Sequence, residues 1–188
     1  NDELLGEIKG DMRRQLDFMS TTIDDFMNFF KPVKDKEDFN LNKILKNTGQ
    51  LLEPVFKRNK IVLTINCDSH IKINGFPNEF GQVLLNILNN SKDVLKECNS
   101  DKKWIKVVGS RNDHQVSVSI LDNGGGIDDA LIDKICDPYF SMKESKNGTG
   151  LGMYMSKVIV EEHMKGQLLI KNKENGLLVT LVFDTVPL

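Results

Sequence analysis

Two glycine-rich clusters, with a polar segment between them, form the stretch of sequence that decides the fold of this chain. The stretch reads Asp-Asn-Gly-Gly-Gly-Ile over 122–127, Asp-Pro-Tyr-Phe-Ser-Met-Lys over 137–143 and Gly-Thr-Gly-Leu-Gly over 148–152. The last cluster leads directly into residues 153–163, which have a helix-forming composition. A glycine turn at a helix N-terminus suits an anion, because free backbone N–H groups and the positive end of the helix dipole point the same way.

Asp122 ends an apolar alternating run, so we expect it where a strand gives way to a turn. A carboxylate at that point can accept a hydrogen bond from an exocyclic amine, and glycines let the backbone approach a flat ring. Either glycine cluster taken alone is also compatible with an ordinary structural turn. The functional interpretation therefore depends on the rest of the chain.

Composition bounds the class of protein. The chain has 188 residues, 39% of them apolar and 28% charged, with a net charge of −2, which suits one domain plus an appendage. The near-neutral balance gives no electrostatic reason to expect nucleic acid or a lipid surface as a partner. Three scattered cysteines without metal-ligand spacing indicate reduced thiols, and no apolar run approaches the roughly 20 residues that cross a bilayer.

Residues 4–30 carry apolar side chains at helical spacing, which predicts a long amphipathic helix. This helix either packs on its own domain or pairs with another helix, from a preceding segment or a second chain. We favour the pairing, because residues 31–38 look like a polar linker. The chain also begins inside a helical pattern, which suggests a fragment of a longer protein.

The remainder mixes helices and strands. Helices are predicted over 41–59, 77–96, 128–136 and 149–164, and strands over 61–66, 71–75, 104–110, 115–121, 167–172 and 177–183. Asn40 suits the N-cap of the first of these helices, and Asn175-Gly176 predicts a tight hairpin. We therefore expect an α+β fold, a two-layer sandwich in which helices cover one face of a mixed sheet.

The helix over 77–96 carries an unusual polar stripe. Its members, spaced by three or four residues, are Glu79, Gln82, Asn86, Asn90 and Asp93. Asparagine has poor helix propensity, so two of them one turn apart cost stability without a local return. An amide oxygen is a neutral hard ligand suited to Mg²⁺ that keeps waters and phosphate oxygens. A stripe that repeats by chance is the alternative.

Four motifs in this order resemble the N, G1, F and G2 boxes of the sensor histidine kinases. They are Asn86-x-x-x-Asn90, Asp122-x-Gly124-x-Gly126, Pro138-Tyr139-Phe140 and Gly148-x-Gly150-x-Gly152. The resemblance covers residues 40–188, the ATP-binding catalytic domain, and implies the Bergerat fold of that family. Residues 1–31 resemble the second helix of the dimerisation and histidine-phosphotransfer hairpin, with 32–39 as a linker.

The resemblance implies a Mg-ATP site and a role for each matching residue. Asn90 would coordinate Mg²⁺, and Asn86 and Asp93 would line the same triphosphate site. Asp122 would recognise the adenine amino group, supported through water by Thr180. Residues 128–147 would form a lid over the nucleotide. The remaining implied contacts are Gly124, Gly126 and Ile127 near the base, Phe140 and Lys143 in the lid, with Lys143 meeting phosphate, and Gly148, Thr149, Gly150, Leu151 and Gly152 on the phosphate side.

The chain departs from the family in lacking an acceptor histidine on its N-terminal helix. Its histidines, His70, His114 and His163, fall in a connection, a hairpin turn and a helix end. We therefore expect ATP binding without autophosphorylation. The resemblance further implies a response-regulator receiver domain as partner, a homodimer through the N-terminal helical region of the full-length protein, and a cytoplasmic location, whether as a soluble kinase or as part of a membrane-anchored sensor. No contact with nucleic acid or membrane is expected.

Two other classes compete with a kinase. Chaperone, mismatch-repair and topoisomerase ATPases of the same fold place a glutamate where this chain has Asn86. An amide cannot accept the proton of an attacking water, so Asn86 favours phosphoryl transfer over hydrolysis. A regulatory module that kept the fold and lost catalysis is the third class; the intact nucleotide-facing positions argue against it.

Overall fold

The computed structural model describes residue 12, residues 35–141 and residues 150–185. The helix predicted over 4–30 therefore lies outside the described residues except for Met12. Three predicted site residues, Lys143, Gly148 and Thr149, also lie outside them. The division of the N-terminal 39 residues into helix and linker remains a prediction.

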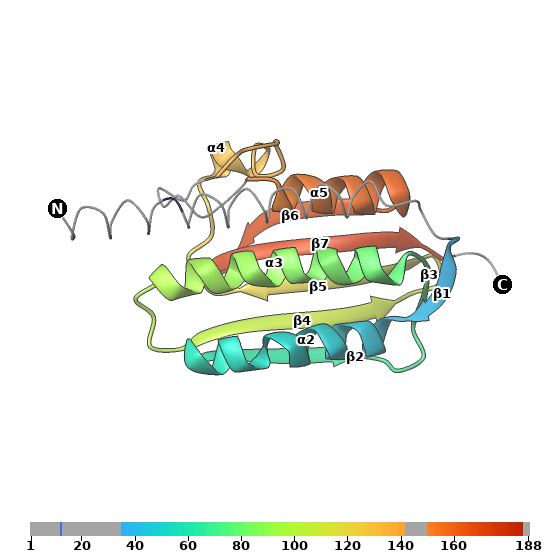
Figure 1. Ribbon diagram of the computed structural model, residues 1–188, viewed down its shortest axis with the longest axis horizontal. Helices are drawn as coiled ribbons and strands as arrows, with labels where there is room; N and C mark the ends of the chain where they lie inside the picture. The colour runs from blue at the N-terminus through green and yellow to red at the C-terminus, as the bar shows by residue number, and fades with distance from the viewer. Residues whose placement is uncertain (1–11, 13–34, 142–149, 186–188) are drawn as a thin grey trace.

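A five-stranded mixed sheet forms one layer (Figure 1). The outer pair at one edge is parallel, and every other neighbouring pair is antiparallel. In sheet order the strands are β2 (Ile61–Cys67), β4 (Lys103–Arg111), β5 (Gln115–Asp122), β7 (Gly176–Asp184) and β6 (Gln167–Lys173). The predicted strands are all present, and the Asn175-Gly176 hairpin is confirmed by the pairing of Lys173 with Gly176.

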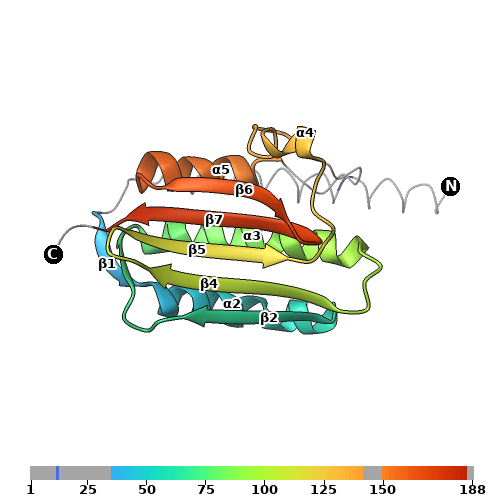
Figure 2. The same cartoon turned by 180° about the vertical axis from the view of Figure 1, so that it is seen from behind.

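Helices make up the second layer. They are α2 (Leu41–Arg58), α3 (Pro77–Glu97) and α5 (Gly152–Val158). All three lie on one face of the sheet, and Figure 2 shows the five strands from the other face, with the helices behind them. The sequence alternates accordingly, since Val116, Val118 and Ile120 of β5 are buried and the residues between them are partly exposed. The predicted two-layer α+β fold is confirmed.

The core sits between α3 and the centre of the sheet. Phe80 of α3 is fully buried, and its ring centroid lies 5.5 Å from that of Phe39 and 5.8 Å from that of Phe183. Phe39 belongs to β1 (Glu37–Asn40), which pairs antiparallel with β3 (Lys72–Gly75). The polar linker predicted over 32–39 thus overlaps a short strand, because Phe39 anchors that strand in the core.

Two predicted helices differ from the structure. In place of one helix over 128–136, only α4 (Asp129–Ile132) is helical, capped by Asp128 Oδ1, which accepts from Ala130 N at 3.0 Å. After α5 the backbone continues as a π-helix, η1 (Ile159–His163), closed by Met164 N donating to Ile159 O at 2.9 Å. Asn40 is the predicted N-cap of α2, and its Oδ1 accepts from Lys43 N at 2.8 Å.

Candidate functional site

Helix α3 connects the two glycine-rich loops. Asn86 donates from Nδ2 to Gly152 O at 3.2 Å and to Ser156 Oγ at 3.4 Å, both on α5. Two turns further along α3, Val94 packs against the first loop, since a Cβ placed on Gly124 would lie 2.5 Å from Val94 Cγ1. Asn90 lies between these two contacts and is half-buried. Within the described residues its side chain makes no hydrogen bond, so its amide oxygen is available to a ligand.

Asp122 is held at the base of the site by three donors. Ser91 Oγ donates to Oδ2 at 2.8 Å, and Oδ1 accepts from Gly124 N at 3.0 Å and from Leu177 N at 3.4 Å. The residue is 5% exposed. A carboxylate has about four acceptor positions, so this arrangement leaves one, on Oδ2, for a further donor.

The turn after β5 is fixed from both sides. Asn172 of β6 accepts from Ile127 N at 3.0 Å and donates to Ile127 O at 2.7 Å and to Asp129 Oδ1 at 2.6 Å. Gly126 has a φ of +74°, and a Cβ there would lie 2.5 Å from Asn172 Oδ1. On the other side, Asn123 Oδ1 accepts from Trp104 N at 2.8 Å. The turn therefore needs glycine at 126 and holds a defined shape without a ligand.

The segment with Phe140 meets the second glycine loop. Gly150 has a φ of +66°, and a Cβ there would collide with the backbone of Tyr139. Tyr139 itself has a φ of +65°, and its side chain is 77% exposed. Phe140 is half-buried, as are Leu151 and Gly152 at the start of α5. The described parts of the F and G2 boxes thus lie in contact.

These contacts bring together the motifs that are separate in the sequence. The N box touches the G2 box through Asn86 and Gly152, the N-box helix touches the G1 turn through Ser91 and Asp122, and the G2 box touches Tyr139 of the F box. The structure thus gathers the described members of the predicted site around α3. The roles assigned to them remain predictions.

Thr180 is the exception, because it lies on the wrong face of the sheet to support Asp122. In the β5–β7 ladder Thr180 is opposite Ser119, and their hydroxyl oxygens are 3.4 Å apart. Ser119 and Asp122 are three residues apart on one strand, so their side chains point to opposite faces. The β7 residue beside Asp122 is Leu177, which contributes its backbone N–H.

The residues of the polar stripe on α3 make different contacts at its two ends. Glu79 Oε2 lies 2.7 Å from Nδ1 of His163 on η1, so this end of the stripe serves a helix–helix contact. Asp93, at the other end, lies 3.2 Å from Lys92 Nζ and is partly exposed. Asn86, Asn90 and Asp93 lie on the part of α3 between its contacts with the two glycine loops, at Asn86 and at Val94.

Ser91 was missed by reasoning from the sequence. It follows Asn90 and lies in the buried stripe of Leu84, Leu88 and Leu95. A hydroxyl in an apolar stripe is the sequence feature that could have indicated its role. A polar side chain buried in an apolar stripe requires a partner, which here is Asp122.

The fold and the arrangement of these motifs define the class, an α+β nucleotide-binding ATPase domain. The chain belongs to the family of histidine kinase-, DNA gyrase B-, and HSP90-like ATPases, whose family model matches residues 75–187. Among curated relatives, Sporulation kinase B of Bacillus subtilis (strain 168) is 28% identical over 150 residues, which cover 79% of this chain and 34% of the relative. The histidine-protein kinase AtoS of Escherichia coli (strain K12) is 29% identical over 177 residues, 93% of this chain and 28% of the relative.

Solved structures agree with the curated relatives. The nucleotide-free catalytic domain of the histidine kinase ThkA has a TM-score of 0.72 at 25% identity, with 82% of this chain and 100% of that one covered. ThkA in complex with the response regulator TrrA has a TM-score of 0.74 at 22% identity, covering 92% of this chain and 49% of that one. The likeness is to the catalytic ATP-binding domain of sensor histidine kinases, as the sequence motifs predicted. No helix in the described part of the chain has the length and apolar character to span a membrane.

Proposed function

We propose that this chain binds Mg-ATP and donates the γ-phosphoryl group to a histidine outside its own sequence, for relay to an aspartate of a response regulator. The observation that carries the proposal is the double attachment of α3, through Asn86 to the second glycine loop and through Ser91 to Asp122. Asn90 lies between these two attachments, and we assign the adenine end of the nucleotide to Asp122 and its phosphate end to the second glycine loop.

Asp122 supplies the adenine end. Its remaining acceptor position on Oδ2 suits the exocyclic amine of adenine, which is a donor, and rejects a base that presents a carbonyl there. Ser91, Gly124 and Leu177 hold the carboxylate in place before the base arrives. Little reorganisation is then needed on binding, which favours affinity.

Asn90 and the start of α5 supply the phosphate end. Among the described residues no group of three His, Cys, Asp or Glu side chains is placed to hold a metal ion. A free amide oxygen at Asn90 fits Mg²⁺ that is held mainly by water and phosphate oxygens. Bound there, the ion would neutralise charge on the triphosphate during phosphoryl transfer. Gly152 at the start of α5 accepts from Asn86, one helical turn from Asn90 on the same face of α3.

Asn86 favours transfer over hydrolysis. Its Nδ2 is already engaged with Gly152 O and Ser156 Oγ, and an amide has no basic site to take a proton from water. None of the three histidines of the chain lies in this site. His70 contacts Asp68, His114 lies in the β4–β5 turn, and His163 pairs with Glu79. The acceptor is therefore assigned to another segment of the parent kinase.

The partners follow from this assignment. The relatives are named Sporulation kinase B and Signal transduction histidine-protein kinase AtoS, and ThkA was solved with a response regulator. We assign this chain a receiver domain as its partner and a homodimer through the N-terminal helical region of the full-length protein. The catalytic part then works in the cytoplasm, where ATP is available.

Calorimetry with ATP and ADP, with and without Mg²⁺, tests the proposal. We expect both nucleotides to bind, and Asn90→Ala to weaken the Mg²⁺-dependent part of ATP affinity about tenfold, or about 1.4 kcal/mol. Asn74→Ala is the matched control; its Nδ2 donates to Asp38 Oδ1 at 2.7 Å across the β1–β3 pair, where no predicted site residue lies, so affinity should not change. Absence of binding would favour the regulatory module, and rapid ATP hydrolysis lost in Asn86→Ala would favour a hydrolase.

A further inference from the structure

Strand β2 forms one edge of the sheet and lacks the features that usually protect an edge. Its sequence, Ile-Val-Leu-Thr-Ile-Asn-Cys, contains no charged residue and no proline, and among the described residues it pairs only with β4. The opposite edge, β6, carries Lys171 and Lys173. Edge strands normally carry charges or prolines, since their unpaired N–H and C=O groups invite another strand. An additional strand can therefore pair with the β2 edge.

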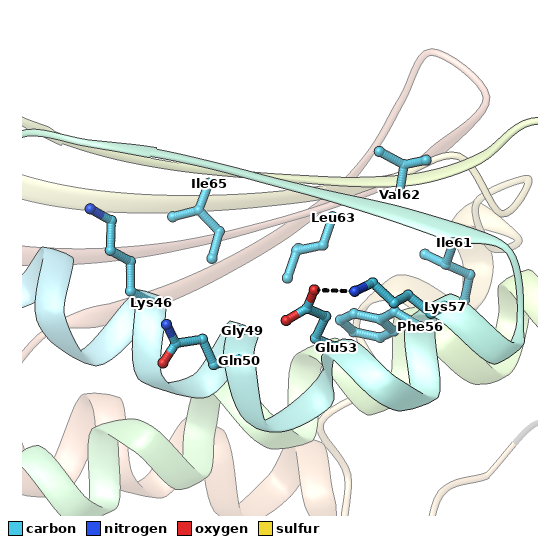
Figure 3. Close-up of a pocket in the computed structure, with 10 residues that line it drawn as sticks. All are labelled: Lys46, Gly49, Gln50, Glu53, Phe56, Lys57, Ile61, Val62, Leu63 and Ile65. Carbon is cyan, nitrogen blue, oxygen red and sulfur yellow. Dashed lines mark ion pairs between the residues drawn. The ribbon is translucent and has the colours of Figure 1, made fainter.

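A cavity of about 470 Å³ lies next to this edge, between β2 and α2 (Figure 3). Phe56 of α2 and Leu63 and Ile65 of β2 provide apolar walls. Gly49 brings the helix close to the strand, since a Cβ there would lie 2.7 Å from Ile65 Cδ1. An added strand presents alternate side chains to such a pocket, which is how peptide-binding sheet edges obtain specificity.

The segment around the cavity is strongly basic within an acidic chain. Residues 41–67 contain five basic side chains and one acidic one, a net charge of +4, so the rest of the chain carries −6 to reach the total of −2. Lys46, Lys57 and Glu53 are the charged residues that line the cavity, so its lining carries a net charge of +1. Lys57 lies 2.6 Å from Glu53, and the net charge of +4 already includes this pair, so the excess positive charge of the segment belongs to its other four basic residues.

We propose that the β2 edge binds an extended acidic segment of a partner protein as an additional strand, with an apolar side chain of that segment in the cavity. The net charge of +4 on residues 41–67 selects an acidic partner, because complementary charge raises the rate of association and like charge disfavours it. A second copy of this chain would bring two +4 segments together, which opposes pairing of β2 with β2. The cavity is lined by α2 and β2 alone, so this surface is separate from the nucleotide site.

Fluorescence anisotropy with synthetic peptides tests the proposal on the 188-residue chain. The probe is a labelled nine-residue peptide that alternates glutamate with leucine or isoleucine. Two further peptides carry N-methyl groups on alternate residues, in one register or the other, so that each lacks the N–H donors of one edge. We expect one methylated peptide to lose affinity about tenfold or more, since several hydrogen bonds disappear, and the other to bind like the probe.

Surface variants separate this site from general charge attraction. Lys46→Glu should weaken the acidic probe several-fold and strengthen a lysine-for-glutamate version, whereas Lys72→Glu on β3 should change neither. Both variants should bind Mg-ATP like the unmodified chain, so failure here is distinct from failure of the nucleotide site. Equal binding of the two methylated peptides, absence of peptide binding, or a β2-mediated dimer of this chain in light scattering would each overturn the proposal.

Discussion

Replacing Asp122 with asparagine should reverse the base preference of the nucleotide site. Oδ1 of Asp122 accepts from two backbone N–H groups, so the amide oxygen of an asparagine must take this position. The amide NH₂ then replaces Oδ2, where Ser91 Oγ can turn from donor to acceptor. The fold is thus preserved while the one position left for the ligand changes from acceptor to donor.

The magnitude follows from the loss of a charged hydrogen bond. Such a bond contributes about 1.5–3 kcal/mol. ATP affinity should therefore fall roughly 10- to 150-fold. Inosine triphosphate carries a carbonyl where ATP carries the amine, so this nucleotide should bind the Asp122→Asn variant more tightly than it binds the unmodified chain.

Calorimetry with both nucleotides, together with thermal unfolding of the free protein, measures these effects. A melting temperature close to that of the unmodified chain would show that Ser91 has adapted. Unchanged ATP affinity in the variant, or an unchanged ratio of ATP to inosine triphosphate affinity, would refute the placement of adenine at Asp122.

Two further predictions concern the loops around the site. Gly150→Ala should lower stability and ATP affinity together, by at least about 1 kcal/mol in unfolding free energy, because Gly150 has a positive φ and packs on the Tyr139 backbone. Gly81→Ala is the control, since open space surrounds a Cβ there and alanine stabilises the α3 helix by up to about 1 kcal/mol relative to glycine. Urea unfolding measures the stability of both variants. Equal losses of stability in the two would contradict the requirement for glycine at position 150. Burial raises the pKa of the Cys136 thiol to about 11, so little of it is thiolate at pH 8. Because the thiolate is the reactive form, iodoacetamide should modify Cys136 about 100-fold more slowly in the folded chain than in urea. Per-residue mass spectrometry checks this rate, and equal rates in the two states would show that Cys136 is not shielded.

The secondary structure was largely predictable because its signals are local. Alternation revealed β4 and β5, helical spacing revealed α3, and Asn175-Gly176 marked the β6–β7 turn. The π-helix after α5 was not predictable in this way. Apolar spacing in a short segment is compatible with either helix type, and the choice depends on how Ile159 and Met164 pack against the rest of the chain.

The motifs of the site could be predicted from the sequence, but the contacts between them could not. The order of the N, G1, F and G2 boxes indicated which residues belong together. Which of them touch depended on strand register, as Thr180 shows. A one-residue change of register would move its side chain to the face of Asp122, and no local pattern reports the register between β5 and β7, which are far apart in the sequence.

By itself, then, the sequence determined the class of fold, the presence of two glycine turns and the chemical character of the α3 stripe, because each depends on neighbours within a few residues. Only the tertiary structure decided that Ser91 holds Asp122, that Asn172 fixes the first turn and that β2, within the described residues, has one unpaired edge beside a cavity. These are contacts between distant segments, or their absence, and they arise when the helices and the sheet pack around a shared core.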